Sequence, residues 1–292
     1  MVQGEALGDP ASRPGDADGE PVTSVIELLP RLRYLRFPVG NAYLWKDPDG
    51  LTLIDAGLPG SAPLIADAIR QIGYQPADLR RLVLTHFHLD HVGAAAAVAD
   101  WGDVEVIAHH ADAPFIRAGA TGPAPDLADW ERPVYDQVMS HLPAGQMTPP
   151  RIDREIEDGD DLGFGDGAVA VGVPGHTPGS VAIYLPRRKV LFAGDAATHR
   201  GDGNVICGVF NVDRAQAAAS LRKLASLDAI VTCFGHGEPL VDAAAVALQG
   251  AAQYAPSSTG HDGRPAKLAS VKRHERVAGI RMQRDYPAAG VA

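Results

Sequence analysis

The segment 82–94, LVLTHFHLDHVGA, places three histidines and one aspartate within six residues at the end of an apolar run. The preceding residues 79–85, LRRLVLT, predict a β-strand, and the Ala-rich stretch 89–101 predicts a helix. The polar cluster therefore falls where a strand turns into a helix. Loops at such positions are held by a rigid scaffold and commonly carry functional side chains.

The spacing within this segment predicts two adjacent metal-binding positions. Side chains alternate along an extended chain, so His86 and His88 point the same way and can bind one metal ion, with Phe87 packed behind them. Asp90 and His91 come where the helix should begin, so their side chains can reach a neighbouring point.

Further candidate ligands follow later strands. His176 comes after VAVGVP in PGHTPGS, Asp195 ends KVLFAGD, and His236 comes after AIVTCFG in FGHG. Each lies beside glycine, which lets the backbone turn sharply and approach other segments closely. We expect these three side chains to join the first cluster.

The order of predicted elements indicates the fold class. Short β-rich runs come first, at 22–29, 32–39, 41–47 and 51–57, and are followed by an alternation of a helix (61–73), a strand (79–85), a helix (89–101) and a strand (104–110). The second half repeats this logic, with strands at 167–175, 180–186, 189–195 and 229–237 and helices at 213–227, which Asp213 should cap, and 241–254. Strands alternating with helices indicate parallel pairing. We therefore predict an α/β protein whose two sheets pack face to face with helices outside, a four-layer αββα sandwich.

The domain organisation follows from composition. Residues 1–21 are rich in Gly, Pro and acidic residues and are expected to form a flexible tail. Residues 22–254 should form one domain, with an insertion of short helices and loop at about 111–151. The extension 255–292 has no predicted structure.

Composition also excludes several classes of protein. The hydrophobic content of 46% and charged content of 21% are typical of a soluble globular chain. A formal net charge of −10 argues against a polynucleotide substrate, because nucleic-acid affinity depends mainly on Lys and Arg. No apolar run is long enough to cross a bilayer, and residues 1–20 lack the basic and apolar regions of a signal peptide. The two cysteines, Cys207 and Cys233, lie among apolar residues as core thiols do, so we expect a cytoplasmic protein without membrane contact.

The motifs together resemble those of the metallo-β-lactamase superfamily. THFHLDH at 85–91, GHTPGS at 175–180, GD at 194–195 and GHG at 235–237 occur in the family's order and at its typical separations. LIDAG at 53–57 is similar to the family's early strand with its aspartate, here Asp55. The resemblance covers about residues 23–250 and implies the αββα fold.

The resemblance also implies a dinuclear metal centre. The first metal would be held by His86, His88 and His176, the second by Asp90, His91 and His236, and both by the bridging Asp195. Five imidazoles with two carboxylates suit zinc, at two ions per chain, and iron and manganese can occupy similar sites.

Such a centre predicts a hydrolase. A metal lowers the pKa of bound water from about 15.7 to about 7, so that a metal-held hydroxide adds to a carbonyl or phosphoryl centre. Asp90 could also carry a proton to the leaving group. We expect a small acyl substrate, that is, a lactone, an ester or a thioester, with lactonase-like and glyoxalase-II-like activities leading.

Four alternatives stay open at this point. Persulfide dioxygenases share the fold and the first motif but use one iron, and metal binding without catalysis is a further class. The family's true β-lactamases usually lack a carboxylate ligand such as Asp195. The acidic charge disfavours the phosphodiester-cleaving branch. In lactonase relatives a tyrosine often follows the bridging aspartate, whereas residues 195–201 here read DAATHRG.

Several residues outside the ligand set also have expected roles. Asp55 is expected to support a ligand rather than act directly, His199 to lie within reach of a substrate, and Cys233 to belong to the core. The remaining histidines, His109, His110, His141, His261 and His274, are expected to be surface or hydrogen-bonding residues. The aromatic residues of the insertion, Phe115, Trp130 and Tyr135, either line the substrate pocket or pack the insertion. The composition leaves a homodimer open.

Overall fold

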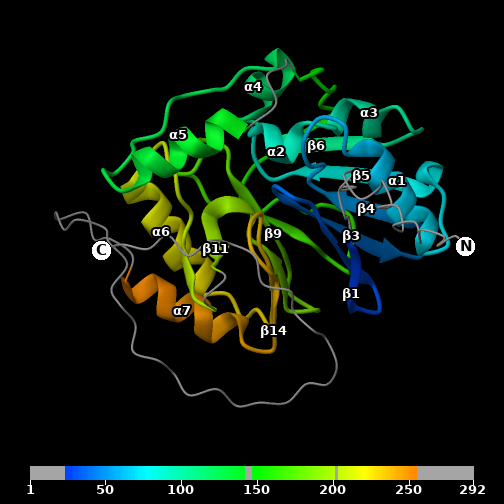
Figure 1. The fold of residues 1–292 in the computed structure, drawn as a ribbon. Coiled ribbons are helices and arrows are strands. Elements are labelled where there is room, and N and C mark those ends of the chain that lie inside the picture. Colours follow the sequence, from blue (N-terminus) through cyan, green and yellow to red (C-terminus); the bar gives the residue numbers. More distant parts are fainter. Residues whose placement is uncertain (1–23, 142–146, 201–202, 255–292) are drawn as a thin grey trace, which may run out of the picture.

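The computed structural model describes residues 24–141, 147–200 and 203–254, which form two sheets with helices on their outer faces (Figure 1). The predicted tail at 1–21 and the extension at 255–292 lie outside the described residues. No helix in the described part of the chain is both long enough and apolar enough to cross a membrane.

The first sheet has seven strands in chain order. They are β1 (Ser24–Leu29), β2 (Leu32–Arg36), β3 (Asn41–Asp47), β4 (Gly50–Ile54), β5 (Leu79–Leu84), β6 (Glu105–His109) and β7 (Arg154–Ile156). Strands β1 to β4 pair antiparallel, and β4 to β7 pair parallel, as the alternation of strands and helices predicted. Helix α1 (Ala62–Gln71) and the short 3₁₀ turn η1 (Pro76–Asp78) connect β4 to β5.

The second sheet has five strands in the order β14-β13-β10-β9-β8. They are β8 (Val169–Gly172), β9 (Val181–Leu185), β10 (Val190–Phe192), β13 (Val231–Cys233) and β14 (Leu240–Val241). A separate hairpin, β11 (Ala197–His199) with β12 (Val205–Cys207), follows the 3₁₀ turn η2 (Gly194–Ala196). The sequence did not predict β7, β11, β12 and β14, each of which is two or three residues long.

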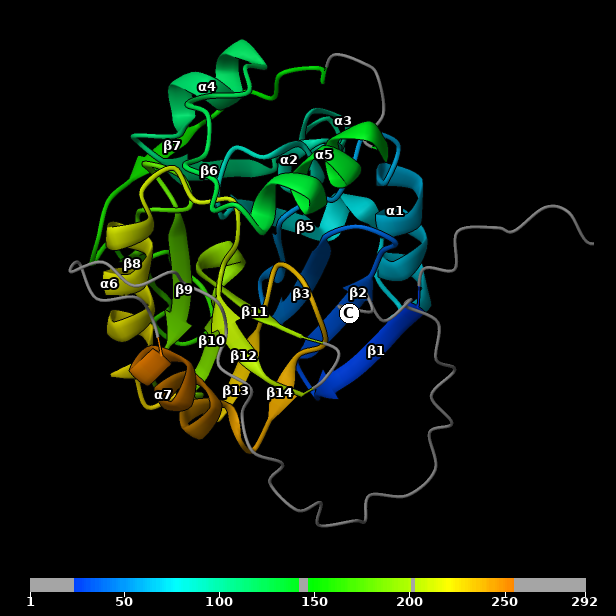
Figure 2. The same ribbon diagram turned by 60° about the vertical axis from the view of Figure 1, so that its left-hand side comes forward.

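Three layers of buried apolar residues hold the sandwich together. Strand β5 shows the arrangement, since Leu82 and Leu84 pack into the outer core with the helices, while Val83 points into the core between the sheets. A third apolar cluster lies between the second sheet and helices α6 (Arg214–Ala225) and α7 (Ala244–Tyr254). The predicted αββα fold is confirmed, and Figure 2 shows α1 and α6 on opposite outer faces. Asp213 caps α6 as predicted, its Oδ1 accepting from Gln216 N at 2.9 Å.

The Ala-rich stretch 89–101 is not one helix, and this prediction was wrong. It forms two short helices, α2 (Leu89–Val92) and α3 (Ala95–Ala99). The carbonyl oxygen of His91 accepts from Ala56 N at 2.7 Å instead of continuing the helical ladder. A Cβ on Gly93 would lie 2.3 Å from Pro59 Cδ, so the backbone here is pressed against the loop after β4. Tertiary contact thus overrides helix propensity.

The insertion contains the short helices and loop that the sequence predicted. Its helices are α4 (Ala113–Ala118) and α5 (Glu131–His141). Both lie at the end of the molecule that also carries α2 (Figures 1 and 2). The buried carboxylate of Glu131 accepts from Phe210 N at 3.1 Å and pairs with Arg214, so α5 is anchored to the loop that precedes α6.

Candidate metal centre

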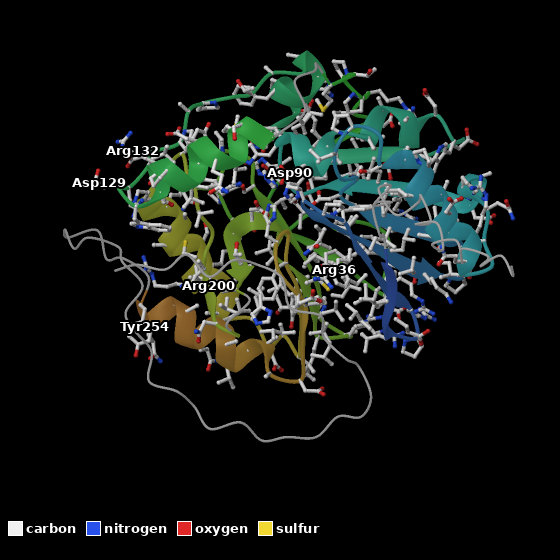
Figure 3. The ribbon with its side chains drawn as sticks, in the orientation of Figure 1. Arg36, Asp90, Asp129, Arg132, Arg200 and Tyr254 are labelled. Atoms are coloured by element: carbon white, nitrogen blue, oxygen red, sulfur yellow. The ribbon has the colours of Figure 1, made fainter. Side chains whose placement is uncertain are left out.

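Seven side chains from five separate chain segments converge at one edge of the sandwich. Two follow β5, two begin α2, and the others come from the β8–β9 loop, the turn η2 after β10, and the loop after β13. They are His86, His88, Asp90, His91, His176, Asp195 and His236. Figure 3 places Asp90 at this edge, near α2. The structure therefore brings together every ligand candidate that the sequence predicted.

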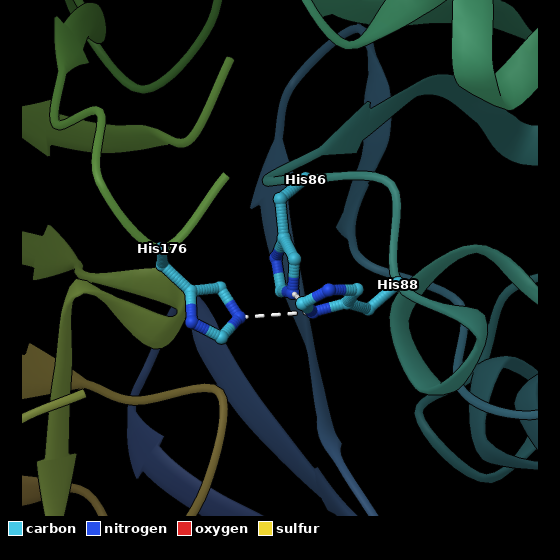
Figure 4. Close-up of side chains that lie close together, drawn as sticks. All are labelled: His86, His88 and His176. Carbon is cyan, nitrogen blue, oxygen red and sulfur yellow. Dashed lines mark hydrogen bonds between the residues drawn. The ribbon is translucent and has the colours of Figure 1, made fainter. Parts of the chain in front are cut away.

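Three imidazoles form one group, called here the three-histidine group: His86, His88 and His176 (Figure 4). His88 Nδ1 lies 3.0 Å from His86 Nε2 and 2.9 Å from His176 Nε2. His176 Nδ1 lies 3.0 Å from Val209 O, which can only accept, so that nitrogen carries the ring proton. His176 Nε2 therefore carries no proton and has a free lone pair.

The same reasoning fixes the tautomer of His86. Thr85 Oγ1 donates to the Asp55 carboxylate at 2.8 Å, so the hydroxyl oxygen accepts from His86 Nδ1 at 3.0 Å. His86 Nε2 then also has a free lone pair. Two lone pairs face His88 Nδ1, which has at most one proton to share, so a buried cation satisfies this group better than any protonation state. The donor set fits a bound metal ion.

The remaining ligand candidates form a mixed group of Asp90, His91 and His236, joined to the first group by Asp195. His91 Nδ1 donates to Asp55 Oδ2 at 2.9 Å, so His91 Nε2 is the nitrogen left to bind a metal, and it is buried without a hydrogen-bond partner. That nitrogen lies 3.6 Å from Asp90 Oδ2 and 3.5 Å from Asp195 Oδ1, and both of these atoms are acceptors. Asp195 Oδ1 is likewise buried without a partner. A cation among these atoms would satisfy all of them.

The two groups differ in their electrostatics. Burial lowers the pKa of all three imidazoles in the three-histidine group, to about 3 for His88, where His176 lowers it further. Burial also lowers the pKa of His91, but the carboxylates of Asp195, Asp90 and Asp55 outweigh it and raise that pKa to about 9. Against the effect of burial, Asp195 and Asp90 raise the pKa of His236 well above its usual value. Without a metal, the first group is neutral at pH 7 and the second holds protons.

Metal binding to the mixed group should therefore be the pH-dependent step. Because zinc must displace the proton of His91, its affinity there is expected to fall about tenfold for each pH unit below about 9, and the proton held by His236, whose pKa is also raised, should lower it further. Binding to the three-histidine group should depend little on pH above the pKa of His88, about 3. Calorimetric titration in two buffers of different ionisation enthalpy counts the protons released at each step. Equal proton release at both steps would contradict this expectation.

Asp55 orients two of the imidazoles, which matches the supporting role predicted for it. Its Oδ2 accepts from His91 Nδ1 and Thr85 Oγ1, and its Oδ1 accepts from Thr85 N at 2.8 Å. Through Thr85 it also fixes His86. Asp55 has a φ of +58°, a conformation that costs energy for a residue other than glycine and that concentrates at functional sites.

Replacing Asp55 by asparagine is expected to lower zinc affinity about 10- to 100-fold. An amide facing His91 Nδ1 can donate to it, which moves the ring proton to Nε2 and removes that nitrogen as a ligand. Affinity measured by competition with a chelator tests this, with Asp67→Asn on the exposed face of α1 as control. A twofold change or less would show that Asp55 does not orient the ring.

The cluster of seven side chains is accessible to solvent from one side. His236 has a side chain 36% exposed and Asp90 one 15% exposed, whereas His86, His91 and His176 are buried. Asp195 Oδ2 lies 3.4 Å from His176 Nε2 and 3.3 Å from His236 Nε2, between the two groups. A substrate would therefore approach over His236 and Asp90.

The other candidate residues from the sequence lie in different parts of the chain, and one of them, His199, adjoins this centre. His199 borders it, its backbone N donating to His236 O at 3.3 Å and its ring Nδ1 to Glu238 O at 2.7 Å. Cys233 is buried in the core between the sheets, as predicted, and burial raises its pKa. His109 and His110 stack on each other away from the seven side chains; the side chain of His141 and all of His261 and His274 lie outside the described residues.

Two of the aromatic residues of the insertion pack against other rings. Phe115 packs on Phe87 with ring centroids 5.2 Å apart, behind the histidine loop. Tyr135 packs edge-on against Phe210, also at 5.2 Å, and Trp130 is half-buried.

Sequence reasoning missed Asp112, which is buried and hydrogen-bonded to two of the ligand loops. Burial raises its pKa to about 6, although the hydrogen bonds that it accepts lower it. The available signal was its position shortly after β6, because the carboxyl ends of parallel strands meet at one edge of a sheet.

Comparison with known proteins agrees with the resemblance seen in the sequence motifs. A family model described as the metallo-beta-lactamase superfamily matches residues 35–236. Probable metallo-hydrolase YflN of Bacillus subtilis is 28% identical over 240 residues, which cover 75% of this chain and 90% of YflN. The hydroxyacylglutathione hydrolase of Mesorhizobium japonicum is 30% identical over 193 residues, covering 65% of this chain and 59% of that protein. A solved metallo-β-lactamase with a HARLDQ motif from Cronobacter sakazakii is 26% identical with a TM-score of 0.58, covering 75% of this chain and 79% of that one.

The matched residues span more than half of the chain and include all seven converging side chains. The two sheets with helices outside are the layers that the motifs implied. The chain belongs to the metallo-β-lactamase superfamily and is a metallo-hydrolase of that fold.

Proposed function

We propose that this protein is a dinuclear zinc hydrolase that acts on a small acyl substrate, a lactone, an ester or a thioester. The observation that carries the proposal is the set of inward-facing imidazole nitrogens of His86, His176 and His91, each selected by an outer hydrogen bond of the ring's other nitrogen. The three-histidine group would hold one ion, the mixed group a second, and Asp195 would bridge them. Two groups of this composition suit zinc.

When bound, zinc would lower the pKa of water from about 15.7 to about 7 and polarise the substrate carbonyl. The chain's own part is to hold the ligands rigidly, through Asp55 and Thr85, and to leave one side open at His236. Asp90 turns Oδ2 toward His236 Nε2, 3.2 Å away, and lies at the same open side. We propose that it takes up a proton there and delivers it to the leaving group.

Replacing Asp90 by asparagine tests this proton transfer. The amide cannot take up and return a proton, so kcat is expected to fall about 10²- to 10⁴-fold, beyond any loss of metal. Metal content and kcat are measured on the same preparation, so that the two effects separate. A variant with both metals and unchanged turnover would remove Asp90 from the proton path.

An acyl substrate is supported by the relatives rather than by the pocket. One of them is named a hydroxyacylglutathione hydrolase, an enzyme acting on an acylated thiol. The net charge of −10 supports a small molecule over a polynucleotide. A cytoplasmic location and a homodimer stay predictions.

Metal analysis together with a substrate panel tests the proposal. The purified protein should contain about two zinc ions per chain and hydrolyse at least one lactone, ester or thioester. Activity should be lost on dialysis against a chelator and return with zinc. One iron per chain with no hydrolysis would instead support a persulfide dioxygenase-like activity. Turnover confined to β-lactams or phosphodiesters would place the protein in another branch of the superfamily. Two bound zinc ions with no turnover of any of these classes would contradict a hydrolytic function.

A further inference from the structure

A single buried carboxylate connects the two loops that carry the three-histidine group. Asp112 is 1% exposed and accepts three hydrogen bonds. Its Oδ2 accepts from Phe87 N at 3.1 Å and from Thr177 Oγ1 at 2.6 Å, and its Oδ1 accepts from Gly179 N at 2.6 Å. Phe87 lies between His86 and His88, and Thr177 directly follows His176.

The two loops belong to different sheets. Phe87 follows β5 of the first sheet, and Thr177 and Gly179 lie between β8 and β9 of the second. The Asp112 carboxylate joins both loops, and one backbone hydrogen bond, from Val181 N to Thr85 O at 2.9 Å, also links the end of β5 to the start of β9. A Cβ on Gly179 would lie 2.6 Å from Asp112 N, which shows how closely the β8–β9 loop packs against Asp112.

The Asp112 side chain does not make the hydrogen bonds expected from its position at the start of a helix. Asp112 is the N-cap residue of α4, where an aspartate side chain normally accepts from the first helical N–H groups. Here the side chain makes no such cap bond. All three hydrogen bonds that it accepts come from the two loops, which a purely helix-stabilising role does not explain.

We propose that Asp112 is a positioning residue that fixes His176 relative to His86 and His88, and so selectively controls metal affinity at the three-histidine group. The inference rests on the proposed metal centre. The mixed group should be much less affected, because one of its two imidazoles, His91, is held by Asp55 and no described hydrogen bond joins the group to Asp112.

Replacing Asp112 by asparagine is the first test. An amide has one acceptor oxygen, so either Phe87 N or Gly179 N faces its NH₂ group and loses its bond. One of the two zinc affinities, measured by stepwise competition with a chelator, should fall about 10- to 100-fold while the other changes little. Asp153→Asn is the matched control, because that aspartate accepts from Val106 N at 2.9 Å at the start of β7 but contacts none of the ligand loops.

A second pair of variants guards against misfolding of Asp112→Asn. Thr177→Val removes the hydroxyl that donates to Asp112 and should lower the same affinity, and Thr177→Ser should restore it. Thermal unfolding of the metal-free variants separates positioning from stability.

The outcomes are distinct. If the wild-type protein binds two zinc ions and Asp112→Asn binds both with unchanged affinity, or with both affinities lowered equally, the inference is wrong. A loss of metal-free stability alone, with affinities unchanged, also overturns it. A wild-type protein that binds no metal would overturn the proposed function itself.

Discussion

Asp195→Asn is expected to remove hydrolytic activity, by about 10³-fold or more, and to leave fewer than two bound zinc ions per chain. The Asp195 carboxylate lies within 4 Å of four of the five imidazoles, through Oδ2 for three of them and through Oδ1 for His91. Asparagine keeps the size but removes the charge that would offset two cations. Its NH₂ group would also donate to the lone pairs that a metal must use. Turnover and metal content of the same preparation test this result.

The matched control is Asp67→Asn, an exposed aspartate paired with Arg70 on α1. Its metal content and activity should equal those of the wild type, because surface pairs of this kind contribute little. If Asp195→Asn keeps two zinc ions and more than about a tenth of the activity, Asp195 does not bridge the two groups.

Gly235→Ala is expected to disable the same centre by adding a single methyl group. A Cβ at this position would lie 1.9 Å from Asp195 Oδ1 and 2.9 Å from His91 Cε1, which is closer than atoms can approach. Gly235 N also donates to Gly194 O at 2.9 Å, so the backbone is held in place and the carboxylate must move. We expect about 1–3 kcal/mol less stability and the loss of at least one zinc ion. Thermal unfolding and metal analysis measure the two effects.

Gly250→Ala is the control for this substitution. Gly250 lies in α7, where a Cβ would meet no neighbouring segment within 4 Å, so alanine there should leave metal content unchanged and slightly favour the helix. Normal metal content in Gly235→Ala would mean that the loop after β13 yields easily, and that the tight packing around Asp195 is not needed for binding.

These effects have a common origin in where the centre lies. Its ligands come from loops of both sheets, and the buried carboxylates Asp55 and Asp112 hold those loops by hydrogen bonds to backbone and side chains. Neither carboxylate is among the seven converging side chains. Stability of the sandwich and geometry of the site are therefore linked through a few polar contacts at one edge.

The sequence predicted the layers of the fold well because each layer has a local signal. Short β-rich apolar runs marked strands such as β3 and β5, and the period of α1 matched an amphipathic helix. The predicted helix at 89–101 failed for a reason that no local signal reveals. The bond from Ala56 N to His91 O joins residues far apart in the chain and ends α2 after one turn.

The chain itself determined the identities of the seven converging side chains, because imidazoles and carboxylates placed directly after apolar strands must emerge where those strands end. Only the tertiary structure decided which nitrogen of each imidazole is free to bind. That choice depends on outer partners such as Val209 O, Thr85 and Asp55, brought in from other segments by packing of the two sheets. A ring's proton position is set by the atom it meets in space, and spacing along the chain carries no record of that atom.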